Sequence, residues 1–451
     1  MLELTPLRDS VPVVAIIGGA VAGSEAARLL AERGVVVLVL EQGAKPYGKI
    51  EGGLPRWHRK LREAEYRKID EALDHPNIFL LRRTRLGRDV TIEQLVSELK
   101  LSAVILANGA WRDRPLPIDG IEAYRGRGLI YQNELVQWFN HSDSPLYKGP
   151  KFEIEDGALI VGGGLASIDV AKIANFEFVR RVLEERGAEV DLEELEIRGI
   201  PEILARHDLS PASVGMKGAL LVYRKRMEDM PLASPKDDSP AALARAEKAR
   251  VKIMKRVMQK YLVRFEGCLS PVEAIVEEGE EGGELRGLRF QKNRVEDGRF
   301  VPVPGELVSI RAPMVLSSIG SIPEPLQGVP LRGELYDFAD WETGEIRGLP
   351  RVYGLGNVLT GKGNIRHSRD NSSQIAAEIA EALVGVGGEA DTSNKRAEIA
   401  AQASKIAERA LPRAMHDPDD RRRVEAFIKK RLLASRASGD YRSMVEETSS
   451  P

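Results

Sequence analysis

The feature that most constrains the fold is a pattern of strand, glycine-rich loop and helix that occurs twice in the sequence. Its first copy opens with the apolar run Val13–Ile17, which ends directly before Gly18. A helical pattern follows at Ala22–Arg33, and a second apolar run occupies Val35–Leu40. Short apolar runs of this kind are typical of parallel strands that are buried on both faces. The spacing predicts a βαβ unit of about thirty residues.

The loop of this first unit places Gly18, Ala20 and Gly23 at the glycine positions of G-x-G-x-x-G, the pattern that binds a dinucleotide pyrophosphate. Alanine at the middle position adds only a methyl group, and we expect a small backbone shift to accommodate it. Glu41 ends the second strand, where an acidic side chain hydrogen-bonds the ribose hydroxyls of the nucleotide. A tight turn in any α/β protein is the alternative, but strand, helix and acid together favour an FAD or NAD site.

The second copy of the pattern starts at the apolar run Ala158–Val161, and its next strand is predicted at Ala219–Tyr223. Small residues again hold the three loop positions: Gly162, Gly164 and Ser167. Basic residues rather than an acid follow the second strand: Arg224, Lys225 and Arg226. A guanidinium binds a 2′-phosphate through two hydrogen bonds, whereas a carboxylate repels it. We therefore predict an NADPH site, with a solvated run of charges as the alternative.

The composition narrows the class of protein. The chain has 451 residues, 30% of them charged, and a net charge of -2, which suits a multidomain globular enzyme and offers no argument for nucleic acid as a partner. No apolar run approaches the roughly 20 residues that span a bilayer, and the N-terminal segment lacks a secretory signal pattern. We expect a cytoplasmic protein without a membrane span. Cys268 is the only cysteine, which excludes an internal disulfide and a cysteine-ligated iron–sulfur cluster, and the histidines form no metal-binding pattern.

Several further segments match the motifs of a known family. Tyr47–Pro55 contains the spacing G-x-x-x-x-G-x-P through Gly48, Gly53 and Pro55. A short turn, Ala107-Asn108-Gly109, stands where the family has A-T-G, and Gly356-Asn357 stands where it has G-D. Longer matching stretches are Arg85–Leu95, Asn133–His141, Gly162–Lys172, Val222–Pro231 and Thr360–Ile365.

These segments give residues 13–383 a resemblance to the flavoproteins with two dinucleotide-binding domains. The branch that they resemble holds the adrenodoxin-type ferredoxin–NADP reductases and the small subunit of glutamate synthase. The resemblance implies an α/β fold of two Rossmann-like domains, the second inserted in the first. The implied ranges are 12–150 and 321–385 for the FAD-binding domain and 151–320 for the NADPH-binding domain. From about Gly387 the composition shifts to Ala, Glu, Lys and Arg, which predicts a helical extension with a disordered tail over residues 386–451. One apolar stripe of its terminal helix is predicted to hold Val424, Phe427, Ile428 and Leu432.

The resemblance also assigns cofactor-binding residues. Those at FAD are Gly18, Ala20, Ala22, Gly23, Glu41, Gly48, Gly53, Ala107, Asn108, Gly109, Gly356 and Asn357. A turn similar to the reductases' glycine turn at the flavin and nicotinamide contributes Gly363, Asn364 and Ile365. Those at NADPH are Gly162, Gly164, Leu165, Ala166, Arg224 and Lys225. Three of the FAD positions depart from the family's common pattern: Ala20, Asn108 and Asn357.

The resemblance implies that the cofactors carry the chemistry, so no residue of the chain is assigned a catalytic role. NADPH passes a hydride to FAD, and with Cys268 alone the electrons must leave for an acceptor outside the chain. A small acidic carrier such as ferredoxin or flavodoxin is the implied partner. It would dock on the basic segment that holds Arg56, Arg59 and Lys60, unless that segment is an ordinary charged helix. The alternatives are an electron-input subunit of a larger complex, like the glutamate synthase small subunit, and a non-catalytic flavoprotein whose flavin contacts have decayed.

Overall fold

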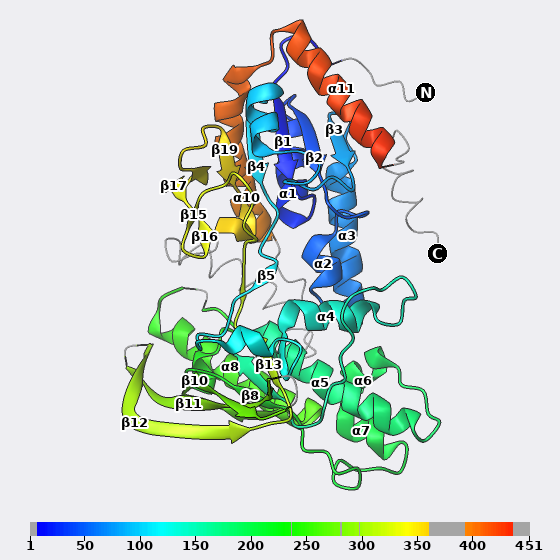
Figure 1. The fold of residues 1–451 in the computed structure, drawn as a ribbon, viewed down its shortest axis with the longest axis vertical. Coiled ribbons are helices and arrows are strands. Elements are labelled where there is room, and N and C mark those ends of the chain that lie inside the picture. The colour runs from blue at the N-terminus through cyan, green and yellow to red at the C-terminus, as the bar shows by residue number, and fades with distance from the viewer. Residues whose placement is uncertain (1–6, 236, 280–281, 297, 360–392, 436–451) are drawn as a thin grey trace.

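The computed structural model describes residues 7–235, 237–279, 282–296, 298–359 and 393–435. They form two lobes, one above the other in Figure 1, that two thin stretches of chain connect. Each stretch carries a two-residue strand, β5 (Arg112–Asp113) or β14 (Ser321–Ile322), and the two strands pair antiparallel. The second lobe is thus inserted in the chain of the first, as predicted.

The first lobe is built on a seven-stranded sheet with the order β17-β18-β19-β4-β1-β2-β3. The strands from β19 to β3 are parallel, whereas β18 pairs antiparallel with both of its neighbours. Their bounds are β1 (Val13–Ile17), β2 (Val36–Leu40), β3 (Ile78–Leu81), β4 (Ala103–Leu106), β17 (Phe338–Asp340), β18 (Glu345–Ile346) and β19 (Val352–Gly354). The first predicted βαβ unit is confirmed, because every residue of β1 and β2 is buried, as continuous apolar strands require.

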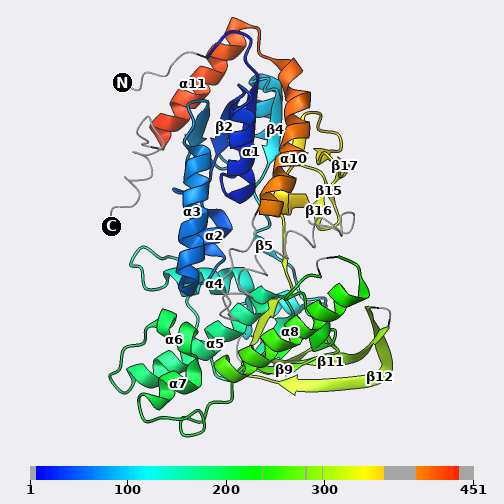
Figure 2. The same cartoon turned by 180° about the vertical axis from the view of Figure 1, so that it is seen from behind.

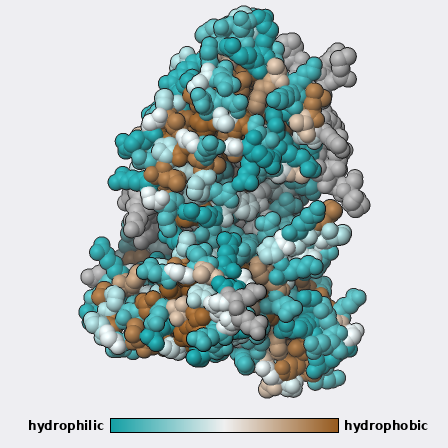
Figure 3. Space-filling view, in the orientation of Figure 1, coloured by the Kyte–Doolittle hydropathy of each residue, from teal (hydrophilic) through white to brown (hydrophobic). Residues whose placement is uncertain are grey.

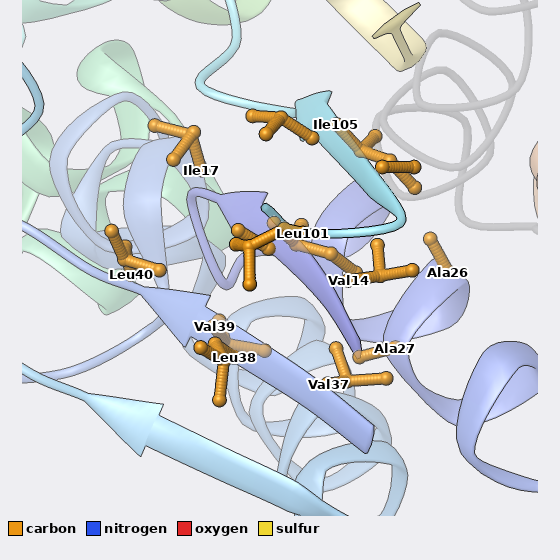
Figure 4. Packing of buried hydrophobic residues seen from close by; sticks show 14 of the residues in the cluster. Val14, Ile17, Ala26, Ala27, Val37, Leu38, Val39, Leu40, Leu101 and Ile105 are labelled. Carbon is orange, nitrogen blue, oxygen red and sulfur yellow. The ribbon is translucent and has the colours of Figure 1, made fainter. Parts of the chain in front are cut away.

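Helix α1 (Val21–Ala31) packs on this sheet through small residues. Ala26 and Ala27 lie beside Val14 and Val37 (Figure 4), and all four side chains are fully buried. Short side chains let the helix backbone approach the strands closely. The other helices and short helical turns of the lobe are α2 (Gly48–Gly52), η1 (Arg56–His58), α3 (Arg59–Leu73), η2 (Gln94–Glu98), η5 (Gly356–Leu359), α10 (Ser393–Ala410), η6 (Leu411–Arg413) and α11 (Pro418–Ala434).

The C-terminal helices belong to the core of the first lobe. Seen from behind, α10 runs next to α1, and α11 lies beside β3 (Figure 2). Three residues of the stripe predicted for the terminal helix, Val424, Ile428 and Leu432, are buried in the same apolar cluster as the central strands. Phe427, the fourth, is partly buried against that cluster. The predicted helical extension is confirmed, and it completes the first lobe.

The second lobe contains a five-stranded parallel sheet with the order β6-β13-β7-β8-β9. Its strands are β6 (Leu129–Tyr131), β7 (Leu159–Gly162), β8 (Leu220–Val222), β9 (Arg264–Glu266) and β13 (Val315–Ser318). The helices and turns around it are η3 (Ile121–Tyr124), α4 (Gln132–His141), α5 (Leu165–Glu184), α6 (Leu192–Arg198), α7 (Ile200–Ala205), η4 (Met227–Asp229) and α8 (Pro240–Tyr261). Because β6 pairs with β13, residues 129–131 belong to the second sheet, and the domain boundaries at 150 and 320 stay predictions.

A long antiparallel ribbon covers one side of the second lobe. It consists of β10 (Leu269–Glu277), β11 (Glu284–Glu296) and β12 (Arg299–Arg311), and β12 forms its outer edge in Figure 1. A separate small hairpin pairs β15 (Leu331–Arg332) with β16 (Leu335–Tyr336). Hydrophilic residues predominate on the face shown in Figure 3, with apolar residues between them in both lobes. Among the helices that the structure describes, none is long and apolar enough to cross a membrane.

Candidate functional site

One pocket in the first lobe gathers most of the residues that the resemblance assigns to FAD. Its cavity volume is about 160 Å³. The predicted residues that line it are Gly18, Ala20, Ala22, Glu41, Gly48, Ala107, Asn108, Gly109, Gly356 and Asn357. They follow the carboxyl ends of four neighbouring parallel strands, β1, β2, β4 and β19. Open α/β sheets bind their ligands at this edge.

The first loop is packed so closely that two of its glycines are required. A Cβ on Gly23 would lie 1.8 Å from the carbonyl oxygen of Gly18, so the close approach of helix α1 to the loop requires glycine at position 23. Gly18 has φ +96° and faces the backbone of Ala107 across the strand ends. Ala20, in contrast, has φ -72°, a conformation that any L residue adopts. The middle position therefore tolerates alanine without backbone strain.

Glu41 lies where a ribose-binding acid was predicted, at the end of β2. Its carboxylate is buried and accepts hydrogen bonds from the backbone N–H groups of Gly19 (3.0 Å) and Gly43 (2.7 Å). Burial raises the pKa of Glu41, although these backbone hydrogen bonds favour the charged form. Each carboxylate oxygen keeps a second lone pair. Glu41 is thus fixed in place and still able to accept hydrogen bonds from a ligand in the pocket.

Asn108, at the position of the family's threonine, has one half of its amide satisfied. Its Nδ2 donates to the hydroxyl of Tyr336 at 3.1 Å, whereas its buried Oδ1 has no hydrogen-bond partner among the described residues. A buried polar atom left without a partner costs free energy unless a ligand supplies one. The pocket therefore contains both this acceptor and the carboxylate of Glu41, a set of groups that fits the hydroxyl and ring N–H donors of FAD.

The pocket is also lined by residues that the sequence did not predict as cofactor-binding, among them Lys49, Trp111, Glu324 and Leu326. The first two stand inside or next to assigned motifs. Lys49 follows Gly48 directly, and Trp111 comes two residues after Gly109. Their position within the motifs was a signal, but only the structure shows that both side chains reach the wall of the pocket.

The second loop lies at the corresponding edge of the second sheet. Val161 of β7 is paired with Val222 of β8, so the loop after β7 neighbours the basic run after β8. Ser167, at the third small-residue position, accepts a hydrogen bond from the N–H of Gly164 (3.1 Å) and donates one to the carbonyl of Ser318 (3.3 Å). The loop is thereby tied to its own helix and to β13.

The three basic residues after β8 have different partners. Arg226 forms an ion pair with Asp229 at 2.8 Å. The exposed guanidinium of Arg224 lies over the ring of Phe300, 5.1 Å from its centroid, and Lys225 donates to the carbonyl of Gly298. Gly298 lies between β11 and β12, and Phe300 lies at the start of β12, so the long ribbon reaches the edge where the 2′-phosphate is predicted. NADPH binding by Arg224 and Lys225 stays a prediction.

Comparison with known proteins agrees with this geometry. Residues 12–204 match the family model described as pyridine nucleotide-disulphide oxidoreductase. The mitochondrial NADPH:adrenodoxin oxidoreductase of Arabidopsis thaliana is 25% identical over 348 residues, which cover 70% of this chain and 69% of that protein. The structure of Mycobacterium tuberculosis FprA in complex with NADPH aligns with a TM-score of 0.61 at 18% identity, covering 97% of this chain and 99% of that one. The chain is thus similar to the flavoproteins with two dinucleotide-binding domains and shares their fold.

A second relative of this chain is the small chain of a Mycobacterium tuberculosis glutamate synthase. It is 29% identical over 166 residues, which cover 35% of this chain and 32% of that protein. Both branches of the predicted resemblance are therefore represented. The predicted fold class, two Rossmann-like domains with a helical C-terminal region, is confirmed by the FprA alignment and by the two parallel sheets.

A buried polar network joins the two lobes. His58 Nε2 lies 3.2 Å from a carboxylate oxygen of Asp169, and Lys172 Nζ lies 3.5 Å from the other. Burial alone would raise the pKa of Asp169, but the charges of His58 and Lys172 hold it low. The Lys172 ammonium also lies over the ring of Trp57, 4.6 Å from its centroid. Trp57 is buried, and its ring packs against Phe139 and Phe176.

The predicted docking residues lie on the first lobe near this junction. Arg56 forms an ion pair with Asp143, and its guanidinium lies over Phe139. Arg59 is exposed and within 3.6 Å of Glu193. Lys60 is exposed. Docking of a partner here stays a prediction, and three predicted cofactor residues lie outside the described part of the chain: Gly363, Asn364 and Ile365.

Proposed function

We propose that the protein is an FAD-dependent NADPH oxidoreductase that passes electrons from NADPH through FAD to an external ferredoxin- or flavodoxin-type carrier. The observation that carries the proposal is the convergence of four strand ends in one pocket, with Glu41 at the end of β2. A second glycine-rich loop beside Arg224 supports a second nucleotide site in the other lobe. The Arabidopsis relative is named an NADPH:adrenodoxin oxidoreductase, and the FprA structure contains NADPH, which supports the same electron donor.

The chain's own residues bind and orient the cofactors. In this proposal Glu41 accepts hydrogen bonds from the ribose of FAD, and the loop at Gly18–Gly23 contacts its pyrophosphate. Asn108 Oδ1 accepts a hydrogen bond from the bound flavin cofactor. Arg224 and Lys225 bind the 2′-phosphate of NADPH. When bound, FAD supplies an acceptor for the two electrons of a hydride and releases them to the next carrier.

The acceptor is external to the chain. Cys268 is the only cysteine, so the chain cannot form a redox-active disulfide of its own. The carrier is a small acidic redox protein, because Arg56, Arg59 and Lys60 form a basic segment near the junction of the lobes. Opposite charges on two surfaces steer the partners together and increase the rate of association.

An anaerobic titration tests this function. The purified chain, supplied with FAD, should acquire flavin absorbance that bleaches when NADPH is added and that bleaches much more slowly with NADH. Addition of a ferredoxin or flavodoxin should then restore the absorbance as electrons leave. A chain that takes up no FAD would contradict the proposal. Stable co-purification with a large catalytic subunit would instead favour an electron-input subunit, like the glutamate synthase relative.

A further inference from the structure

Lys49 places an ammonium group in the wall of the pocket where the two lobes meet. Its Nζ donates to Oδ1 of Asn133 and to Oγ of Ser321, both at 3.0 Å. It also lies 5.5 Å from the centroid of the Trp111 ring. Lys49 belongs to α2 in the first lobe, Asn133 to α4, and Ser321 to the connecting strand β14. The ammonium of α2 is therefore held by hydrogen bonds to two other segments of the chain, α4 and β14.

The partners of this ammonium are unusual because they carry no charge. Within the described residues, no carboxylate lies within ion-pair distance of Lys49, and the nearby carboxyl of Asp113 is bound to the backbone N–H of Asn133 at 3.2 Å. Burial lowers the pKa of Lys49 to about 8. A desolvated charge without a direct counter-charge costs free energy. Such an arrangement is expected where a ligand supplies the opposite charge.

Two features place the redox-active ring of FAD beside Lys49. Lys49 and Trp111 line the same pocket as Glu41 and Asn108. Ser321 lies on the pair of strands, β5 and β14, that connects the lobes. A hydride passes only between rings in contact, so the flavin ring and the nicotinamide must meet at this junction and not at the far ends of the two nucleotides.

We propose that Lys49 stabilises the negative charge that the FAD ring gains when it is reduced. This inference rests on the proposed function. A hydride delivers two electrons and one proton, so the ring leaves the transfer with one additional negative charge while NADPH becomes NADP⁺. Lys49 keeps its proton and supplies the counter-charge. Charge close to the ring nitrogens tunes a flavin, and a fixed charge in a partly dehydrated site acts strongly. Lys49 is thus a residue that sets the reduction potential of the cofactor.

The charged groups around Lys49 predict the direction of each substitution. The carboxylate of Asp113, on β5, has the opposite charge to Lys49 and would offset its effect on the charge of the flavin ring. Farther from Lys49, Glu134 and Arg125 form an ion pair at 2.7 Å. Removing the ammonium in Lys49→Met leaves a side chain of similar length without charge. Lys49→Arg keeps the charge. Asp113→Asn removes the opposing charge and should act in the reverse direction to Lys49→Met.

The first measurement uses sulfite, which adds reversibly to oxidised flavin and leaves the ring negatively charged. It is made on the FAD-loaded protein without turnover. Lys49→Met should weaken sulfite binding about tenfold or more, and Asp113→Asn should strengthen it. Lys49→Arg should stay within about threefold of the native chain. Lys292→Met, on β11 of the second lobe, is the control and should have no effect.

The second measurement is the pH dependence of the flavin midpoint potential. Reduction raises the pKa of Lys49, because the new negative charge favours the ammonium. Around and above pH 8, the pKa to which burial lowers Lys49 in the cofactor-free chain, the native chain should take up more protons per two electrons than Lys49→Met, by up to one. A purely structural role for Lys49 would lower the thermal stability of the variants and leave this proton count unchanged.

The outcomes separate this inference from the proposed function. If the native chain takes up no FAD, the proposed function fails and the inference fails with it. If Lys49→Met binds FAD with unchanged sulfite affinity and proton count, the inference alone is overturned. Should Lys49→Met fail to retain FAD, Asp113→Asn decides, since an unchanged sulfite affinity in that variant also overturns the proposal.

Discussion

The methyl group of Ala20 occupies space that is available only because residue 48 is a glycine. A Cβ on Gly48 would lie 2.8 Å from the Cβ of Ala20, and no other side chain lies closer to that position. The two residues come from the first loop and from the G-x-x-x-x-G-x-P segment, and they face each other in the wall of the pocket. The alanine in the first loop is therefore matched by the glycine opposite it.

This relationship predicts that Gly48→Ala disrupts the pocket more than Ala20→Gly. Gly48 has φ +48°, so alanine there brings both a collision and about 1 kcal/mol of backbone strain. We expect Gly48→Ala to weaken FAD binding at least about tenfold, a loss of about 1.4 kcal/mol. Fluorescence quenching of FAD measures both variants. The double variant should recover part of the loss, because the collision is removed while the strain remains; strict additivity of the two effects would contradict the contact.

Arg224 and Arg226 predict a difference in nucleotide selectivity. Arg224 is exposed beside the second loop, whereas Arg226 forms an ion pair with Asp229. Arg224→Gln should weaken binding of adenosine 2′,5′-bisphosphate by about 1.5–3 kcal/mol, the contribution of hydrogen bonds to a charged group. Calorimetry with that ligand and with 5′-AMP, which lacks the 2′-phosphate, measures the difference. The same loss in Arg226→Gln, or an equal loss for both ligands, would show that Arg224 does not recognise the phosphate.

The proposed carrier interface predicts an effect that depends on the electron acceptor. Reversal of charge in Arg59→Glu and Lys60→Glu should raise the apparent KM for a ferredoxin, because electrostatic steering is lost. The KM for a small dye should not change, since a dye does not need the docking surface. Steady-state kinetics with both acceptors at low and at high salt checks this. Equal effects on the two acceptors would place the partner elsewhere.

Arg396 predicts how strongly the C-terminal helices stabilise the first lobe. Its guanidinium joins α10 to Glu25 of α1 (3.0 Å) and to Glu65 of α3 (3.3 Å), and both carboxylates are buried. Each carboxylate keeps a second partner, Arg28 for Glu25 and Lys68 for Glu65, so Arg396→Met removes only part of the compensating charge. It should lower the free energy of unfolding by about 1.5–3 kcal/mol, the contribution of hydrogen bonds to charged groups. Arg409→Met, which removes an exposed ion pair with Glu345, is the control and should cost less than about 1 kcal/mol. Urea denaturation measures both, and similar losses would contradict this assignment.

Asp113 predicts a pH-dependent stability of the protein without FAD. Burial raises the pKa of its carboxyl to about 6. The folded chain therefore binds this proton more tightly than the unfolded chain, and the carboxyl costs stability above about pH 6 but not near pH 4. Asp113→Asn should raise the Tm at pH 7.5, with the gain vanishing as the pH falls toward 4. Asp119→Asn, at an exposed position, is the control. A gain that persists at pH 4 would point to a cause other than this ionisation.

The individual strands, loops and helices of this protein could be predicted from the sequence alone. Continuous apolar runs predicted β1 and β2 within one residue, and glycine spacing with Glu41 predicted the first loop, because these features depend on neighbours close in the chain. The same holds for the stripe of Val424, Ile428 and Leu432, which a helical period places on one face.

Which of these segments contact one another is seen only in the tertiary structure. Asn108 reaches the first loop because β4 pairs with β1, and Lys49 reaches Ser321 because the chain returns to the first lobe through β14. Both contacts join residues far apart in the sequence, where local periodicity carries no information. The same long-range packing places the C-terminal helices in the first core and β6 in the second sheet. Each of these placements buries apolar surface that no single segment could bury alone, so it forms only when the whole chain folds.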